Sequence, residues 1–364
     1  MQVSVKNKKT SDTSYKTILS HKEAIEKELA NFFKQDAKTL LYADISPFGQ
    51  DSISLLKEFN LRPAKRLRGS LACLAYDYTT SKSQGSVGLK AAAAIELVQD
   101  YLLIIDDVMD LSATRRGGPT IHELYKTEGF DDHTAKMLAI NVGLLAQHFA
   151  SLIIANIDAD PGLVVQALKI LHRNIGLTCM GQLDDLNQNV NREVEQSAVL
   201  MMYKLKSSYY TFVDPLQIGV VLGGQTDTSV LNEIEDFGIN AGIAFQLRDD
   251  VLGLFGDPLT TGKPITDDIK EGKHTLLINY GFKHLNTVDK KYLKSKLGCG
   301  NVSNQEIEKV QAIIRDCGAE KYVEDQIVKY ANKARAIVDS SNFWDNTTKD
   351  LLSSLVTFSE GRKK

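Results

Sequence analysis

Apolar residues recur at helical spacing along most of this chain, and this periodicity limits the folds that it can adopt. Ile25, Leu29, Phe32 and Phe33 follow the i, i+4, i+7, i+8 pattern of one face of an α-helix. Four segments are apolar on more than one face, as expected for helices buried in a bundle. They are residues 91–109, 137–155, 208–223 and 238–255. Sustained two-residue alternation is hard to find, so the sequence predicts an all-α fold.

Local signals predict where some helices begin and end. Ser303 and Glu306 have the spacing of a capping box, which satisfies backbone amides at the start of a helix. Gly318 is expected to end that helix, and Tyr322–Val338 is expected to form another. Pro215 lies inside an apolar run, where it is expected to kink a helix.

The composition fits one large folded domain. Of 364 residues, 43% are hydrophobic, which is enough for an extensive core. The net charge of −3 argues against a nucleic-acid binder, which needs positive charge to replace counterions. No repeat, linker or composition shift marks an internal boundary. We therefore expect a flexible extension over residues 1–18 and a single helical domain over residues 19–364.

Cysteine usage and hydropathy bear on cellular location. The four cysteines form no CxxC pair, which suits reduced intracellular thiols better than a disulfide framework or a zinc site. No uninterrupted apolar run reaches the roughly 20 residues that span a bilayer. The first residues are polar and lack the apolar core of a secretory signal. The sequence therefore predicts a cytoplasmic protein with no integral membrane segment.

Two clusters of aspartates each follow a buried helical segment. In the first, Asp106 and Asp110 are one helical turn apart, so both carboxylates face one spot. In the second, Asp249 and Asp250 follow another apolar stretch. Either cluster alone is also explained by an exposed acidic helix end. Together they favour a site where Mg²⁺, which prefers oxygen ligands, bridges the aspartates to a diphosphate.

Basic residues flank both acidic clusters. Any one of them is more often a solvated surface cation, but arginine and lysine both bind phosphate, and arginine does so bidentately. They are Arg62, Lys65, Arg66, Arg68, Arg115, Arg116, Lys204, Lys206, Lys263 and Lys273. Their position beside the aspartates indicates anionic substrates that bind together with metal.

At these residues the chain resembles the trans-isoprenyl diphosphate synthases, the family that includes farnesyl and geranylgeranyl diphosphate synthases. Ordered motifs over nearly all of the chain beyond residue 20 carry the resemblance. They are AKRLRG (64–69), ELVQ (96–99), DDVMD with RRGGPTIH (106–122), GQLDD (181–185), KLKSS (204–208), FQLRDD (245–250) and TGKPITDDIKEGKHT (261–275). The resemblance implies an antiparallel helix bundle around a deep central cavity, usually as a homodimer.

The resemblance also implies roles for individual residues. Asp106, Asp110 and Asp249 would bind Mg²⁺, three ions with substrate present, and Asp107 and Asp250 would support them. The substrate-binding residues form three sets. Arg115, Lys206 and Lys263 would bind the allylic diphosphate; Lys65, Arg68, Gln99 and Arg116 would bind isopentenyl diphosphate; and Ser207, Gln246 and Phe245 would line the path of the allylic cation. Arg115, Lys206, Ser207 and Gln246 are the predicted catalytic residues.

The implied reaction joins isopentenyl diphosphate to an allylic diphosphate of C5 to C15. Metal and basic side chains stabilise the departing diphosphate, so the allylic C–O bond ionises. A dry apolar cavity protects the carbocation, which the isopentenyl double bond attacks. The released diphosphate can take the proton that is lost, so no dedicated histidine is required.

Five residues in four motifs depart from the family pattern. Gly253 stands where many relatives have a third aspartate, and Gln99 stands where many have histidine. Ser207 replaces the usual threonine but keeps the hydroxyl, and Pro63-Ala64 replaces a double glycine. We expect the protein to be active despite these changes, with weaker metal binding because of Gly253.

Tyr101 and Leu102 are the candidates for setting product length. They precede Asp106 by about 7.5 Å along a helix, so their side chains can form a floor below the aspartates. An aromatic residue at the fifth position resembles geranylgeranyl synthases, which make a C20 product. A C15 product, a longer product, or a Tyr101 ring that merely packs in the core remain alternatives.

Three other classes of protein share part of these motifs. A class I terpene cyclase or a head-to-head synthase would not need the isopentenyl site that Lys65, Gln99 and Arg116 imply. A non-catalytic regulatory subunit would be expected to lose aspartates or the lysine of the KLKSS motif, and this chain retains them. The charged carboxyl terminus, residues 360–364, either closes over the isopentenyl site or is a frayed tail.

Overall fold

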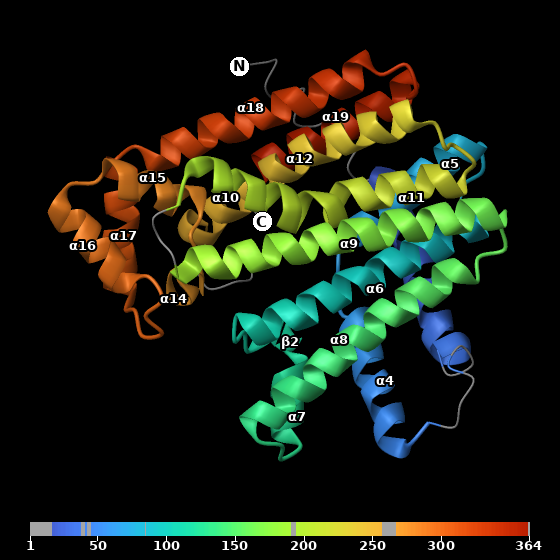
Figure 1. The fold of residues 1–364 in the computed structure, drawn as a ribbon, viewed down its shortest axis with the longest axis horizontal. Helices are drawn as coiled ribbons and strands as arrows, with labels where there is room; N and C mark the ends of the chain where they lie inside the picture. Colours follow the sequence, from blue (N-terminus) through green and yellow to red (C-terminus); the bar gives the residue numbers. More distant parts are fainter. Residues whose placement is uncertain are drawn as a thin grey trace. The chain divides into compact units, whose positions relative to one another are not determined.

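The computed structural model describes residues 17–37, 41, 45–83, 85–190, 194–256 and 267–362. These residues are almost entirely helical (Figure 1). Within these ranges the strands are β1 (Thr114–Arg115) and β2 (Gly118–Pro119), which form one antiparallel pair. The predicted all-α fold is therefore confirmed.

The chain divides into two compact units. The described residues of the first unit lie within 17–172 and 214–228, and those of the second lie within 173–213 and 229–362. Ile18 is fully buried, so packing begins before the predicted boundary at residue 19. Residues 1–16 of the predicted extension lie outside the described residues, and the single-domain assignment stays a prediction.

The first unit is built around α6 (Ser86–Met109). Its other helical elements are η1 (Leu19–His21), α2 (Lys22–Asn31), η2 (Phe32–Asp36), α4 (Pro47–Leu61), α5 (Leu67–Thr80), α7 (Ile121–Thr127), α8 (Asp132–Ala155), the first part of α9 (Pro161–Val190) and α11 (Asp214–Leu222). Helix α6 packs against α5, α8 and α11. Its four consecutive alanines at 91–94 are buried on all sides, and their small side chains let these neighbours approach closely.

The helical elements of the second unit begin with the remainder of α9. They continue with α10 (Gln196–Tyr203), η3 (Lys204–Val213), α12 (Thr228–Phe255), α14 (Asp267–Glu271), α15 (Leu276–His284), α16 (Thr287–Lys296), α17 (Asn304–Asp316), α18 (Ala319–Ser340) and α19 (Asn346–Gly361). The capping box of Ser303 and Glu306 is present at the start of α17, and Gly318 adopts the left-handed φ of 84° between α17 and α18. Both helix boundaries predicted there are confirmed.

Element η3 is a π-helix that runs directly into α11. The backbone changes from π to α just before Pro215, which cannot donate a helical hydrogen bond, and the kink expected at this proline stays a prediction. Such π segments recur at functional sites, and this one carries Lys206 and Ser207.

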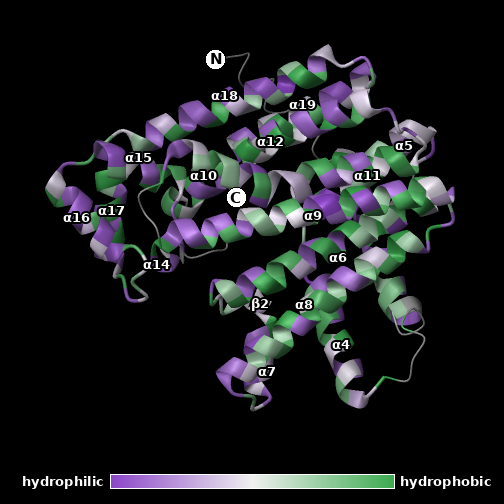
Figure 2. Ribbon diagram, in the orientation of Figure 1, coloured by the Kyte–Doolittle hydropathy of each residue, from purple (hydrophilic) through white to green (hydrophobic). Residues whose placement is uncertain are grey.

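Helix α8 is long and apolar enough, by length and composition, to cross a membrane. Within the structure 44% of its apolar window is buried, and it packs against α6 and α7. Figure 2 shows that α6, α8 and α11 are more hydrophobic than α16 and α17. Because the core helix of a folded protein meets the same criterion, α8 is weak evidence for a membrane segment, whose absence stays a prediction.

Close packing of α5 against α11 depends on Gly219. A Cβ at this position would lie 2.4 Å from the Ala72 carbonyl oxygen and 2.7 Å from the Ala75 Cβ. We expect Gly219→Ala to lower the free energy of unfolding by about 1–3 kcal/mol, because the two backbones must separate. Denaturant titration measures this change.

The matched control is Gly176→Ala on α9, where a Cβ would meet no atom within 4 Å. Alanine there is expected to be neutral or to stabilise the helix by up to about 1 kcal/mol. Equal loss of stability in both variants would contradict the packing role assigned to Gly219.

Candidate active site

The first aspartate cluster lies at the carboxyl end of α6. Asp106 is 24% exposed and Asp110 is partly exposed, whereas the Asp107 side chain is only 1% exposed. The Asp110 amide donates to the Asp106 carbonyl at 2.8 Å, so the helical turn that brings the two carboxylates onto one face is intact. The carboxyl end of a helix dipole is itself negative, so this end of α6 attracts cations.

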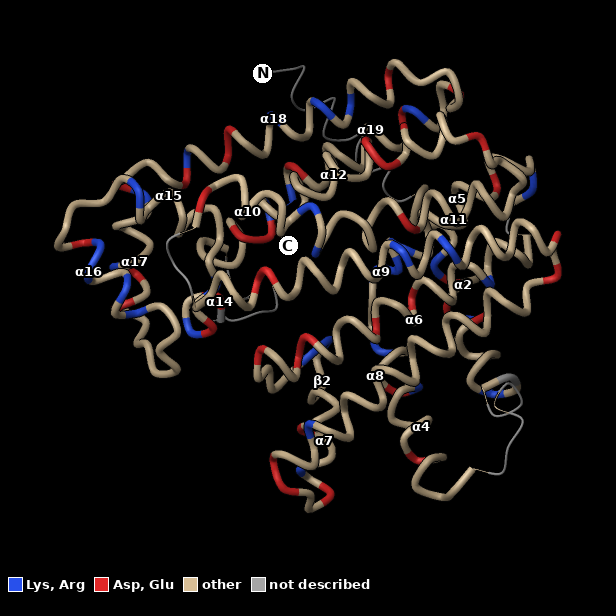
Figure 3. The backbone as a smooth tube through the Cα atoms, in the orientation of Figure 1, with Lys and Arg blue, Asp and Glu red and all other residues tan. Residues whose placement is uncertain are grey.

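The guanidinium of Arg115 is a cation of the chain that lies at this end of α6. Its Nε donates to Asp107 Oδ1 at 2.7 Å, and its Nη2 lies 3.9 Å from Asp106 Oδ2. Figure 3 shows acidic and basic residues together where α6 ends beside β2. Asp107 therefore faces inward to Arg115, while Asp106 and Asp110 stay accessible from solvent.

A tight hairpin between β1 and β2 presents Arg115 and Arg116. Arg116 and Gly117 have φ values of 52° and 78°, the left-handed pair required by a two-residue turn of type I′. Arg62 clamps this turn, because its Nη1 donates to the carbonyls of Arg115 at 3.0 Å and Pro119 at 2.8 Å. Gly118 allows that contact, since a Cβ there would lie 2.8 Å from the Arg62 guanidinium carbon.

The predicted isopentenyl residues belong to the same unit. Lys65 is exposed and Arg68 is partly buried, and between them Arg66 is fully buried and paired with Glu96 at 3.2 Å. Glu96 lies one turn before the partly buried Gln99 on α6. The Arg66–Glu96 pair thus ties the basic segment to the turn of α6 that carries Gln99.

In the second unit, the predicted catalytic residues Ser207 and Gln246 belong to one hydrogen-bond network. Ser207 Oγ donates to Gln246 Oε1 at 2.6 Å, and Gln246 Nε2 donates to Asp250 Oδ1 at 2.9 Å. Tyr203 donates its hydroxyl proton to the other oxygen of Asp250 and accepts from the Leu276 amide at 2.7 Å. These hydrogen bonds fix the orientation of the Gln246 amide.

Lys206 pairs with an acid that lies in the GQLDD motif. Its Nζ donates to Asp185 Oδ2 at 2.6 Å, and the Asp185 side chain is only 6% exposed. Gly181 lets η3 approach α9 here, because a Cβ at position 181 would lie 2.2 Å from the Lys206 amide nitrogen. The close approach holds the lysine in place.

The second aspartate pair repeats the arrangement of the first. Asp249 is 39% exposed, while its neighbour Asp250 is buried and hydrogen-bonded. Burial raises the pKa of Asp250 to about 7, against the lowering effect of the hydrogen bonds from Tyr203 and Gln246. In both pairs the first aspartate is therefore accessible and the second is held inside.

Asp249 contacts the carboxyl terminus of the chain. Arg362, just beyond α19, forms an ion pair with Asp249, and its guanidinium carbon lies 4.2 Å from the centroid of the Phe245 ring. Residues 363 and 364 of the predicted tail lie outside the described residues. The sequence does not predict this contact, because helical periodicity and motif spacing do not pair residues so far apart along the chain.

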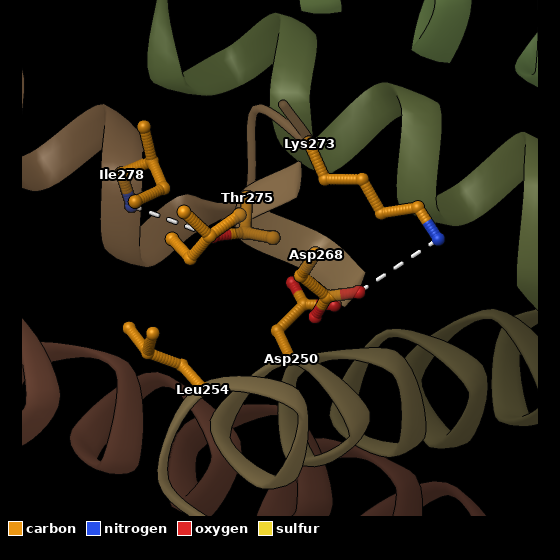
Figure 4. Close-up of a pocket in the computed structure, with 7 residues that line it drawn as sticks. Asp250, Leu254, Asp268, Lys273, Thr275 and Ile278 are labelled. Atoms are coloured by element: carbon orange, nitrogen blue, oxygen red, sulfur yellow. Dashed lines mark hydrogen bonds and ion pairs between the residues drawn. The ribbon is translucent and has the colours of Figure 1, made fainter. Parts of the chain in front are cut away.

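A small pocket lies beside α12 in the second unit, and Asp268 is one of the residues that line it (Figure 4). The pocket is lined by Asp250, Leu254, Asp268, Ile269, Lys273, Thr275 and Ile278, with room for about one water molecule. A Cβ at position 253 would lie 2.0 Å from Asp268 Oδ2. The carboxylate of Asp268 thus occupies the space that a side chain at position 253 would need. The pocket is too small for a prenyl chain, so the predicted deep cavity stays a prediction.

Moving the carboxylate from position 268 to position 253 tests whether the two side chains compete for the same space. We expect Gly253→Asp to cost about 1–3 kcal/mol of unfolding free energy, because the new side chain overlaps Asp268 and crowds like charges. Adding Asp268→Gly should restore most of that loss. Thermal unfolding measures both, and a double variant no more stable than the single one would contradict the shared space.

The remaining predicted residues are placed as follows. Tyr101 and Leu102 are partly buried on α6, and Lys263 lies outside the described residues. Within the described ranges no three His, Cys, Asp or Glu side chains converge on one point that would hold a metal ion. The donor set still fits Mg²⁺, which is commonly bound through one or two carboxylates with substrate phosphates and water. Asp106 and Asp110 offer such a pair.

Comparisons with known proteins agree on one family. The sequence pattern of the polyprenyl synthetase family matches residues 52–315, across both units. The chain is 29% identical to a geranylgeranyl diphosphate synthase of Saccharolobus solfataricus, over 92% of this chain and 94% of that protein. It is 31% identical to a geranylfarnesyl diphosphate synthase of Aeropyrum pernix, over 82% and 91% of the two chains.

A solved structure extends the likeness to three dimensions. The geranylgeranyl pyrophosphate synthase of Corynebacterium glutamicum, in complex with isoprenyl diphosphate and magnesium, superposes with a TM-score of 0.85. The two sequences are 28% identical, and the match covers 93% of this chain and 98% of the other.

Proposed function

Since the chain belongs to the polyprenyl synthetase family and is a prenyltransferase, we propose that it condenses isopentenyl diphosphate with C5 to C15 allylic diphosphates. The proposed product is a linear all-trans polyprenyl diphosphate, geranylgeranyl diphosphate. The observation that carries the proposal is the repeated aspartate arrangement. In each unit an accessible aspartate lies beside a buried one. Arg115 pairs with the buried Asp107 in the first unit, and Arg362 pairs with the accessible Asp249 in the second.

Ionisation of the allylic diphosphate is the first proposed step. Asp106, Asp110 and Asp249 would hold Mg²⁺, which supplies positive charge to the departing diphosphate when bound. Arg115 and Lys206 bind and orient that diphosphate. Their pairing with Asp107 and Asp185 holds each cation in place before substrate arrives.

Condensation follows at the cation so formed. The Gln246 amide, fixed between Ser207 and Asp250, offers its oxygen to the positive charge. Lys65, Arg68, Gln99 and Arg116 bind isopentenyl diphosphate, whose double bond attacks the allylic carbon. The released diphosphate accepts the proton that is lost. The elongated prenyl diphosphate and the protonated diphosphate, both anionic, therefore form without a protein base.

A C20 product is favoured by two observations. Tyr101 lies on α6 five residues before Asp106, where its ring can limit the chain, and Leu102 lies beside it. Several relatives are geranylgeranyl diphosphate synthases, although the relative in Candida albicans is a farnesyl pyrophosphate synthase. Farnesyl diphosphate is the alternative product.

We also propose a homodimer in the cytoplasm. Met137 and Leu144, two turns apart on α8, expose 42% and 43% of their surface, which supports an apolar contact between copies. The structure has no disulfide among the described residues, which include all four cysteines, and this supports a reducing compartment.

Purified protein with Mg²⁺, labelled isopentenyl diphosphate and each of the C5, C10 and C15 primers tests the function. Chain extension that stops at C20 is expected, and chromatography of the dephosphorylated products measures it. A stop at C15 would sink the C20 proposal alone. Condensation with none of the primers by folded protein would contradict the function and favour a non-catalytic subunit.

Asp106→Ala should reduce turnover by about 100-fold or more, because a metal ligand is lost. The matched control is Asp325→Ala, which removes an exposed aspartate that pairs with Lys321 on α18. Turnover of the control should stay near wild type. An equal loss in both variants would argue against a metal-binding role for Asp106.

A further inference from the structure

Arg116 is held by a buried polar network. Its Nη1 donates to Asp100 Oδ1 at 2.9 Å and to the Phe59 carbonyl at 3.3 Å, and its guanidinium carbon lies 5.4 Å from the Phe59 ring centroid. The side chain is only 9% exposed. Its Nη2, also buried, has no hydrogen-bond partner among the described residues. A buried arginine donor of this kind points to a ligand that completes it.

Asp100 is the centre of the network. It is fully buried on α6, directly after Gln99, and its second oxygen accepts from Asn60 Nδ2. Asn60 is also fully buried, at the end of α4, and its Oδ1 finds no hydrogen-bond partner in the described ranges. Arg66 donates to the Asn60 carbonyl, which links the network to the basic segment. No role in binding or catalysis has been assigned above to Asp100 or Asn60.

A purely structural ion pair is a poor explanation of this arrangement. Buried ion pairs contribute little to stability, because desolvation offsets their attraction. The left-handed φ of 52° at Arg116 belongs to the type I′ turn and does not explain the pair. The Nη2 that lacks a partner among the described residues remains, and it indicates that the network holds this guanidinium for a ligand.

We propose that Asp100 and Asn60 are positioning residues that hold the Arg116 guanidinium so that its Nη2 donates to the diphosphate of isopentenyl diphosphate. The proposal rests on the function proposed above, which assigns Arg116 to that substrate. Asp100 itself touches no substrate and acts through Arg116. Gln99, its neighbour on α6, belongs to the same substrate site.

The hydrogen bond from Arg116 and the negative charge of Asp100 have opposite effects on diphosphate binding. As a hydrogen-bond acceptor it places Arg116, which favours diphosphate binding; as an anion it opposes the binding of a second anion. Asp100→Ala removes both effects. Asp100→Asn removes the charge but keeps an acceptor for Arg116, because the Asn60 amide can turn and offer its Oδ1 to the new amide group.

We expect Asp100→Ala to raise KM for isopentenyl diphosphate about ten-fold, with kcat and the KM of the allylic primer changed less than about two-fold. Asp100→Asn should keep KM within about three-fold of wild type. Asn60→Ala should raise it by a few-fold, and this variant decides the question if Asp100→Ala does not fold. Asp325→Ala is the surface control.

A double-mutant cycle separates positioning from general stability. Once Arg116→Ala is present, adding Asp100→Ala should raise KM no further, because Asp100 has nothing left to position. Additive effects in folded variants, or an unchanged KM in Asp100→Ala, would overturn the proposal.

Calorimetric titration with isopentenyl diphosphate alone gives a readout besides turnover. Wild-type protein that binds it, with about ten-fold weaker binding in Asp100→Ala, supports the proposal. Equal binding by the two proteins overturns the positioning role and leaves the prenyltransferase function intact. Wild-type protein that neither binds nor condenses isopentenyl diphosphate overturns both.

Discussion

Negative charge at the carboxyl end of a buried helix is the constraint on which the site depends. Helix α6 ends in three aspartates, where the helix dipole is already negative, so the end is stable only if cations compensate it. Arg115 compensates from the inside by pairing with Asp107. Asp106 and Asp110 remain on the accessible side, where the proposed Mg²⁺ would compensate their charge.

At least three of the six cations predicted to bind substrate have acidic partners among the described residues of the chain. Arg115 pairs with Asp107, Arg116 with Asp100, and Lys206 with Asp185. Each pair fixes a side chain in position but also cancels part of its charge. A diphosphate that enters such a site gains oriented hydrogen-bond donors, while much of the charge that neutralises it has to come with metal. The need for both oriented donors and metal explains why acidic and basic side chains lie next to one another around the proposed site.

Glycines and turns give this polar arrangement its exact spacing. Gly118 admits the Arg62 clamp on the hairpin, Gly181 admits the π-helix that carries Lys206, and Gly253 leaves space for Asp268. None of these glycines contributes a functional group. Each is needed because a Cβ would overlap a group that holds a charged residue of the site in place, or a carboxylate beside it.

The sequence by itself determined the all-α fold, the helix ends at Ser303 and Gly318, and the two aspartate clusters, because periodicity, capping and i, i+4 spacing are local properties. It did not reveal which aspartate of each pair is buried, or that Arg116 depends on Asp100 and Asn60. It also missed the contacts of Asp268 with Gly253 and of Arg362 with Asp249. Only the tertiary structure decided these, because burial and long-range pairing depend on which helices pack together, and no local pattern records that.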